Sequence, residues 1–210
     1  MERSRPDVSA PAFWDELYAE GRDGWELGSA APALRAWIEA GGHFSAMPVG
    51  EPARICVPGC GRGHDARLLA RSGYRVWGFD FAATAIARAR ALAADEGVDV
   101  AFERRDLFTL ATEFPNFFDG IWEYTCFCAI DPARRGEYAE LLRAIVRRGG
   151  TLLACFFPLR DGGDGPPFPV SRAEIEHLLV PHFRIVAAGP PARSAAQRQG
   201  LEWLVVAERT

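Results

Sequence analysis

Glycines recur at alternate positions in the segment VPGCGRG: Gly59, Gly61 and Gly63, with Cys60 between the first two. A short apolar run typical of a buried strand precedes them, and a segment with the apolar spacing of a helix follows. Glycines between a strand and a helix let the backbone turn tightly and approach a ligand without a Cβ clash. The pattern therefore predicts a ligand-binding loop that includes Gly59, Cys60 and Gly61.

Two aspartates close the next two predicted strands. Asp80 ends YRVWGFD, and Asp106 ends VDVAFERRD. Ligands of open α/β sheets bind outside the carboxyl ends of the strands, so both carboxylates are expected beside the glycine loop. Asp80 is suited to accept hydrogen bonds from two ribose hydroxyls and Asp106 from an adenine amino group, while the Leu107 N–H can donate to a ring nitrogen. The alternative is that both aspartates only cap helices.

The glycine spacing distinguishes between two classes of nucleoside cofactor. The fingerprint of dinucleotide binding, G-x-G-x-x-G, has its third glycine one residue later, where this chain has His64. Asp65 at the start of the next helix would also repel a pyrophosphate. Both points favour a cationic sulfonium cofactor, S-adenosyl-L-methionine, whose product is S-adenosyl-L-homocysteine. An NAD(P)-dependent oxidoreductase and a non-catalytic nucleoside-binding protein remain the alternatives, although the chain has no lysine for a Tyr-x-x-x-Lys dyad.

The elements that must position these residues alternate along the chain. Alternating strands and helices predict an α/β fold with a mostly parallel sheet covered on both faces, and the last two strands, which no helix separates, predict an antiparallel edge hairpin. This predicted order matches the Rossmann-like class I methyltransferase architecture, with a seven-stranded sheet. Strands are expected within 53–59, 74–80, 98–106, 118–130, 151–159, 183–189 and 201–209, and helices within 64–73, 82–97, 131–150 and 171–183.

Length and composition indicate one domain. The chain has 210 residues and a net charge of −4, with both signs scattered, which argues against a nucleic-acid or membrane partner. We expect a flexible N-terminus over residues 1–12 and a single methyltransferase domain over 13–210, with an N-terminal helical lid at about 13–45. Five cysteines, mostly in apolar runs, suggest reduced thiols in the cytoplasm and no metal site.

Several segments together give the chain a family resemblance. FWDELYAEGRDGWELG, VPGCGRGHD, EYTCFCAIDP and GGDGPPFPVS resemble, in that order along the chain, segments of the thiopurine S-methyltransferase family. The last two look closer to its halide and thiol methyltransferase branch than to the thiopurine enzymes. The resemblance extends from about Phe13 to Arg209 and implies a methyltransferase that uses S-adenosylmethionine. Pro58, where many methyltransferases have an acidic residue, is a feature that the family often shares.

The resemblance also implies roles for individual residues. Trp14, Tyr18 and Trp25 match an aromatic trio that folds over the cofactor, and Tyr124 matches a tyrosine on the cofactor side near the methyl acceptor. Aromatic rings near a sulfonium would contribute cation–π attraction, and the alternative is that the trio is only a core-facing helix stripe. The family's cofactor contacts fall on Gly59, Asp80, Asp106 and Leu107.

The acceptor that this chemistry suits is a small, soft nucleophile. Methyl transfer from a sulfonium is an in-line displacement, and a thiolate, sulfide or halide ion needs no general base. We find no catalytic triad or acid–base pair, so we expect a thiol, sulfide or halide acceptor, with a thiopurine or a selenium or tellurium compound as the alternative. Tyr124 could position the acceptor, and Phe127, Phe157 and Phe168 could form an apolar pocket or belong to the core.

Overall fold

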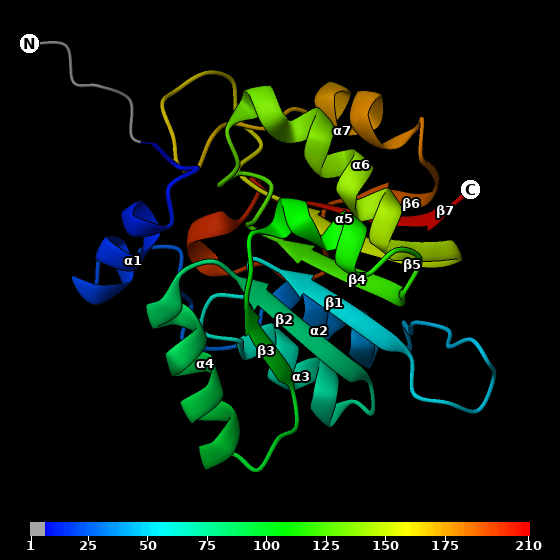
Figure 1. Cartoon of the computed structure of the whole chain (residues 1–210). Coiled ribbons are helices and arrows are strands. Elements are labelled where there is room, and N and C mark those ends of the chain that lie inside the picture. The colour runs from blue at the N-terminus through cyan, green and yellow to red at the C-terminus, as the bar shows by residue number, and fades with distance from the viewer. Residues whose placement is uncertain (1–6) are drawn as a thin grey trace, which may run out of the picture.

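The computed structural model describes residues 7–210 and contains a seven-stranded sheet with helices on both faces (Figure 1). The strand order is β3-β2-β1-β4-β5-β7-β6. The first five strands pair in parallel, whereas β7 runs antiparallel to both β5 and β6. The predicted fold class and edge hairpin are therefore confirmed. The strands are β1 Arg54–Pro58, β2 Arg75–Asp80, β3 Ala101–Arg104, β4 Phe118–Tyr124, β5 Val146–Phe156, β6 Phe183–Gly189 and β7 Trp203–Arg209.

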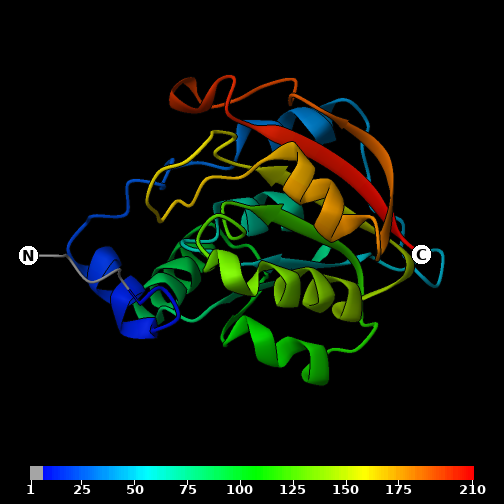
Figure 2. The same cartoon turned by 90° about the horizontal axis from the view of Figure 1, so that it is seen from above.

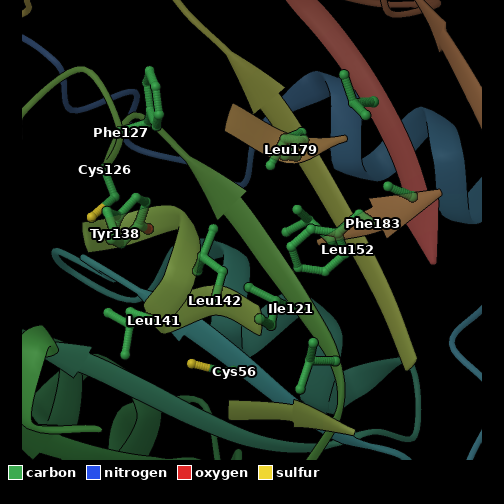
Figure 3. Packing of buried hydrophobic residues seen from close by; sticks show 14 of the residues in the cluster. Cys56, Ile121, Cys126, Phe127, Tyr138, Leu141, Leu142, Leu152, Leu179 and Phe183 are labelled. Atoms are coloured by element: carbon green, nitrogen blue, oxygen red, sulfur yellow. The ribbon is translucent and has the colours of Figure 1, made fainter. Parts of the chain in front are cut away.

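The helices divide between two apolar cores, one on each face of the sheet. One core joins the sheet to α6 and α7 around Ile121, Tyr138 and Leu142 (Figure 3), and the other joins it to α2, α3 and α4 around Leu34 and Leu69. The helices are α1 Pro11–Ala19, α2 Pro32–Glu39, α3 His64–Arg71, α4 Ala83–Asp95, α5 Leu110–Glu113, α6 Arg135–Ile145 and α7 Arg172–Leu179, with 3-10 turns η1 Leu107–Thr109, η2 Pro132–Arg134 and η3 Ala196–Arg198.

Local signals in the sequence explain several helix ends. The Ser171 Oγ accepts a hydrogen bond from the Glu174 N–H at 3.1 Å, so the predicted N-terminal cap of α7 is present. Gly73 and Gly97 follow α3 and α4 with positive φ angles, as expected for glycines just after a helix. These ends are set by residues close in sequence, which is why a pattern can predict them.

The boundary between α6 and β5 differs from the prediction. The helical segment was expected to end in Gly149 and Gly150, yet α6 stops at Ile145 and β5 already begins at Val146. Val146 is completely buried and pairs with Phe118 of β4, so sheet pairing overrides the helical pattern of the local sequence. The third strand is likewise shorter than expected and ends at Arg104, before Asp106.

The N-terminal segment lies at one end of the sheet, where α1 packs beside α4 (Figures 1 and 2). The Thr84 N–H donates to the Asp15 carboxylate at 2.9 Å and connects the two helices. The flexible segment expected over 1–12 falls partly outside the described residues. Within the described part, Val8 is buried and α1 begins at Pro11.

Candidate active site

The glycine loop lies between β1 and α3 and has left-handed backbone at all three glycines. Gly59 has φ 59°, and a Cβ there would lie 2.8 Å from the Cys126 sulfur. A Cβ on Gly61, at φ 52°, would lie 3.0 Å from the Tyr18 hydroxyl. The Cys60 N–H donates to the Phe79 carbonyl at 2.9 Å, which ties the loop to the end of β2. The loop thus requires glycine both for its backbone angles and for its close neighbours.

Asp80 is buried where β2 ends and holds the glycine loop in place. Its two carboxylate oxygens accept hydrogen bonds from the Gly61 N–H at 3.0 Å and the Ala82 N–H at 2.9 Å. Burial raises the pKa of Asp80 to about 6, although these hydrogen bonds oppose the rise. A carboxylate oxygen has further lone pairs, so both oxygens can still accept from a ligand.

A cavity of about 640 Å³ opens beside Asp80, between the carboxyl ends of the strands and the N-terminal segment. This is where ligands of such sheets bind. Every residue that the sequence singled out for cofactor contact or catalysis contributes to its wall. These residues are Trp14, Tyr18, Trp25, Gly59, Cys60, Gly61, Asp80, Asp106, Leu107 and Tyr124.

The three aromatic residues of the N-terminal segment pack on one another along the cavity. Trp25 lies edge-on to both Trp14 and Tyr18, with ring centroids 5.4 Å apart in each pair. The Trp25 indole N–H donates to the Tyr18 hydroxyl at 3.3 Å, and the Trp14 N–H donates to the Val8 carbonyl at 2.8 Å. Trp14 also belongs to a small apolar cluster, so the trio both packs in a core and covers the cavity.

Asp106 lies on the opposite rim and caps a short helical turn. Its carboxylate accepts from the Phe108 N–H at 3.0 Å. The alternative that this aspartate caps a helix is therefore realised at Asp106, which remains exposed at the cavity wall next to Leu107.

Charged residues connect the N-terminal segment to the glycine loop. Arg62 forms an ion pair with Asp23, and His64 Nε2 lies 3.0 Å from the Glu26 carboxylate. Asp65, the residue that disfavours a pyrophosphate, accepts hydrogen bonds from the Ala31 N–H at 2.6 Å and from a tryptophan indole N–H of β4 at 2.8 Å. These contacts fasten the N-terminal segment over the loop, and sequence patterns gave no indication of them.

Tyr124 ends β4 with its ring at the cavity and its hydroxyl turned to a buried carboxylate. The hydroxyl donates to Glu202 Oε1 at 2.6 Å, and the ring stacks on Trp122 with centroids 5.7 Å apart. Burial and the neighbouring Glu202 carboxylate raise the pKa of Tyr124 far above its usual range. The hydroxyl is therefore neutral, and Glu202 already accepts its proton in a hydrogen bond.

Beyond Tyr124, the backbone makes a turn that the buried Glu123 stabilises. Thr125 has a φ of 62°, rare for a β-branched residue, and Glu123 Oε1 accepts from the Phe127 N–H at 2.7 Å across this turn. Burial raises the pKa of Glu123 to about 7. The turn brings Cys126 to the cavity wall beside Gly59.

Of the three phenylalanines considered for an acceptor pocket, only Phe157 lines the cavity. Phe127 packs in the core with Tyr138 and Phe156 (Figure 3), and Phe168 is buried in the cluster beneath α1. Arg198 of η3 lines the same part of the cavity as Phe157 and Tyr124. No sequence pattern predicted Arg198 as a residue of the cavity wall, because it lies in a polar loop between two strands.

Within the described residues 7–210, no group of three or more His, Cys, Asp or Glu side chains is arranged to hold a metal ion. None of the helices described is long and apolar enough to cross a membrane.

Comparison with known proteins gives relatives over most of the chain. Residues 9–205 match the family model of thiopurine S-methyltransferase. A probable thiol methyltransferase 2 of Arabidopsis thaliana is 31% identical over 91% of this chain and 82% of that protein. Thiocyanate methyltransferase 1 of Brassica oleracea is 30% identical over 95% of this chain and 85% of that protein. A thiopurine S-methyltransferase of Pseudomonas fluorescens is 26% identical over 80% of this chain and 81% of that protein.

Solved structures support the fold. The 1,6-didemethyltoxoflavin-N1-methyltransferase of Burkholderia thailandensis superimposes with a TM-score of 0.73 at 22% identity, covering 97% of this chain and 88% of that one. Magnesium protoporphyrin IX methyltransferase of Synechocystis gives 0.71 at 18% identity, covering 99% and 100%. The comparisons confirm the predicted methyltransferase class and its cofactor, S-adenosylmethionine. The chain belongs to the thiopurine S-methyltransferase family.

Proposed function

We propose that this enzyme transfers the methyl group of S-adenosylmethionine directly to a small, soft nucleophile: a thiol, a sulfide or a halide ion. The observation that carries the proposal is that the acidic groups of the cavity wall already accept hydrogen bonds from the protein. Asp65, Asp80, Asp106 and Asp131 accept from backbone N–H groups, and Glu26 accepts from the Gly28 N–H. These hydrogen bonds favour the ionised carboxylates and weaken them as bases for an acceptor that must lose a proton, whereas an anion needs no base.

The residues present fit the cofactor. Gly59 and Gly61 bring the loop backbone to the cavity wall without side chains, and Asp80 lies beside them with unused lone pairs. We assign the ribose hydroxyls to Asp80, the adenine to Asp106 and Leu107, and the remaining contacts to the aromatic trio and the loop. The full set is Trp14, Tyr18, Trp25, Gly59, Cys60, Gly61, Asp80, Asp106 and Leu107.

The chemistry divides between cofactor and protein. Bound S-adenosylmethionine supplies an activated methyl group, so the protein has to orient the acceptor and exclude water. The rings of Tyr18 and Trp25 offer a positive sulfonium about 1–2 kcal/mol of cation–π attraction when they are desolvated. Tyr124 presents its ring to the acceptor end of the cavity while Glu202 fixes its hydroxyl. We propose that Tyr124 positions the acceptor by contact with its ring and takes no part in proton transfer. The acceptor ionises by itself.

The test is a panel of acceptors with the purified enzyme, with S-adenosylhomocysteine formation as the measurement. The panel contains iodide, thiocyanate, bisulfide, a small aliphatic thiol, selenite, 6-mercaptopurine, a primary amine and a carboxylate. We expect turnover with the soft anions and thiols and far less with the amine and the carboxylate. Turnover of the amine or carboxylate alone would overturn the proposal. Turnover of 6-mercaptopurine or selenite alone would favour the alternative, a thiopurine or metalloid methyltransferase.

A further inference from the structure

The N-terminal segment passes along the cavity as a short strap, residues 22–27, between two glycines. Gly21 and Gly28 have φ angles of 66° and 68°, and a Cβ on either glycine would meet no atom within 4 Å. The strap brings Trp25 and Glu26 to the cavity wall. Glycine has the least restricted backbone of all residues, so the strap has a possible hinge at each end.

The strap is fastened to the first residue of α3, His64. His64 Nε2 lies 3.0 Å from Glu26 Oε1, and His64 Nδ1 lies 2.9 Å from Arg67 Nη2. Burial favours a higher pKa for Glu26, but hydrogen bonds from His64 and from the Gly28 N–H outweigh burial and hold this pKa below its usual range. An arginine only donates hydrogen bonds and an ionised carboxylate only accepts them. His64 therefore accepts at Nδ1 and donates from Nε2, which defines the neutral Nε2–H tautomer.

Arg67 gives this contact a rigid base. Arg67 is 3% exposed, its Nε donates to Glu96 Oε2 at 2.8 Å just after α4, and its Nη1 donates to the Arg62 carbonyl of the glycine loop at 2.7 Å. The Arg62 side chain in turn pairs with Asp23 of the strap. The strap is thus held at Asp23 and Glu26 by side chains of the glycine loop and of the helix that follows it.

The contact between Glu26 and His64, which we call the latch, involves protein atoms alone and can form with or without a bound cofactor. The strap is one wall of the cavity, and the glycine loop and the strand ends on its other side belong to the sheet. We propose that the strap is the gate through which S-adenosylmethionine enters and S-adenosylhomocysteine leaves, and that His64 is the positioning residue that holds this gate closed. Because the gate must open for entry and for exit, a weaker latch should raise both rates.

Surface plasmon resonance with immobilised protein measures the association and dissociation rate constants of S-adenosylhomocysteine separately. We expect His64→Ala to raise both rate constants about 5- to 30-fold, the lower part of the range for hydrogen bonds to charged groups, since both side chains keep some contact with water. The equilibrium constant should change far less than either rate constant. His64→Gln keeps one donor and one acceptor and should accelerate exchange less. The matched controls are His177→Ala and His177→Gln, at an exposed histidine of α7, which should exchange like the wild type.

Glu26→Ala opens the latch from the strap and leaves α3 unchanged, so it repeats the test should His64→Ala fail to fold. It should also raise both rate constants, and the double variant should exchange no faster than the faster single variant, because both substitutions remove one interaction. Nitrogen-15 NMR of the His64 ring, assigned by comparison with His64→Gln, should show the neutral Nε2–H tautomer in the wild type.

Wild-type exchange rates in the folded His64→Ala and Glu26→Ala proteins would overturn the gate, and so would additive effects of the two substitutions. Faster dissociation with an unchanged association rate constant would show that these side chains hold the bound cofactor and not the strap, and would overturn it as well. A His64 ring with its proton on Nδ1 would contradict the latch. Exchange of S-adenosylhomocysteine requires no acceptor, so these outcomes do not depend on the acceptor panel.

Discussion

Binding of S-adenosylhomocysteine should depend on pH through Asp80. Burial raises the pKa of Asp80 from 3.8 to about 6, which corresponds to about 3 kcal/mol against its ionised form in the empty protein. Ribose hydroxyls donate to a carboxylate far better than to a carboxylic acid. Ligand binding should therefore draw Asp80 to the ionised state. Below about pH 6 the affinity should fall by up to about tenfold per pH unit, because a proton must first leave.

The stability of the empty protein should change with pH in the direction opposite to its affinity for S-adenosylhomocysteine. A carboxyl whose pKa is higher in the folded than in the unfolded protein binds its proton more tightly when folded. The empty protein should thus lose stability as pH rises from about 4 to about 6, while the affinity for S-adenosylhomocysteine rises over the same pH range. Asp80→Asn removes both dependences and should weaken S-adenosylhomocysteine binding at neutral pH by about 1.5–3 kcal/mol.

Isothermal calorimetry in buffers with different ionisation enthalpies measures both affinity and protons released. The wild type should release a proton below about pH 6, and Asp80→Asn should not. Glu123 titrates near neutral pH as well, with a pKa of about 7, so the variant is the necessary control. Constant affinity of the wild type across this range, or a variant with the same pH profile, would refute the assignment of Asp80 to the ribose.

Three further predictions address the lid, the loop and the acceptor. Amide hydrogen exchange across residues 13–28 should slow on adding S-adenosylhomocysteine. Equal protection with and without ligand would show that these residues are part of the ordinary core. Gly59→Ala should lower the free energy of unfolding in urea by about 1–3 kcal/mol, because it adds a clash with Cys126 to the backbone strain at φ 59°. Gly97→Ala, at φ 63° and with open space around it, should carry the backbone strain alone. Equal losses of stability in the two variants would contradict the close contact between Gly59 and Cys126. At saturating cofactor above about pH 7, methylation of a thiol should rise with ionisation of its own group, whose pKa is about 8.5, and methylation of iodide should stay flat. A bell-shaped iodide profile would reveal an essential ionising group.

The parts of the site that the sequence could predict are those that follow from local pattern. Gly59, Gly61 and Asp80 lie at the ends of adjacent parallel strands, and any sheet of this type brings such positions together. The aromatic trio was recognised through a resemblance, and all three rings line the cavity.

The rest depends on contacts between distant parts of the chain. Arg198 reaches the Trp25 carbonyl across 173 residues, and Glu202 meets Tyr124 across 78. Nothing in the loop around Arg198 marks it as buried, because its burial comes from the N-terminal segment. The position of Phe127, which the sequence left open between the acceptor pocket and the core, has the same origin: the turn stabilised by Glu123 directs its ring to the core.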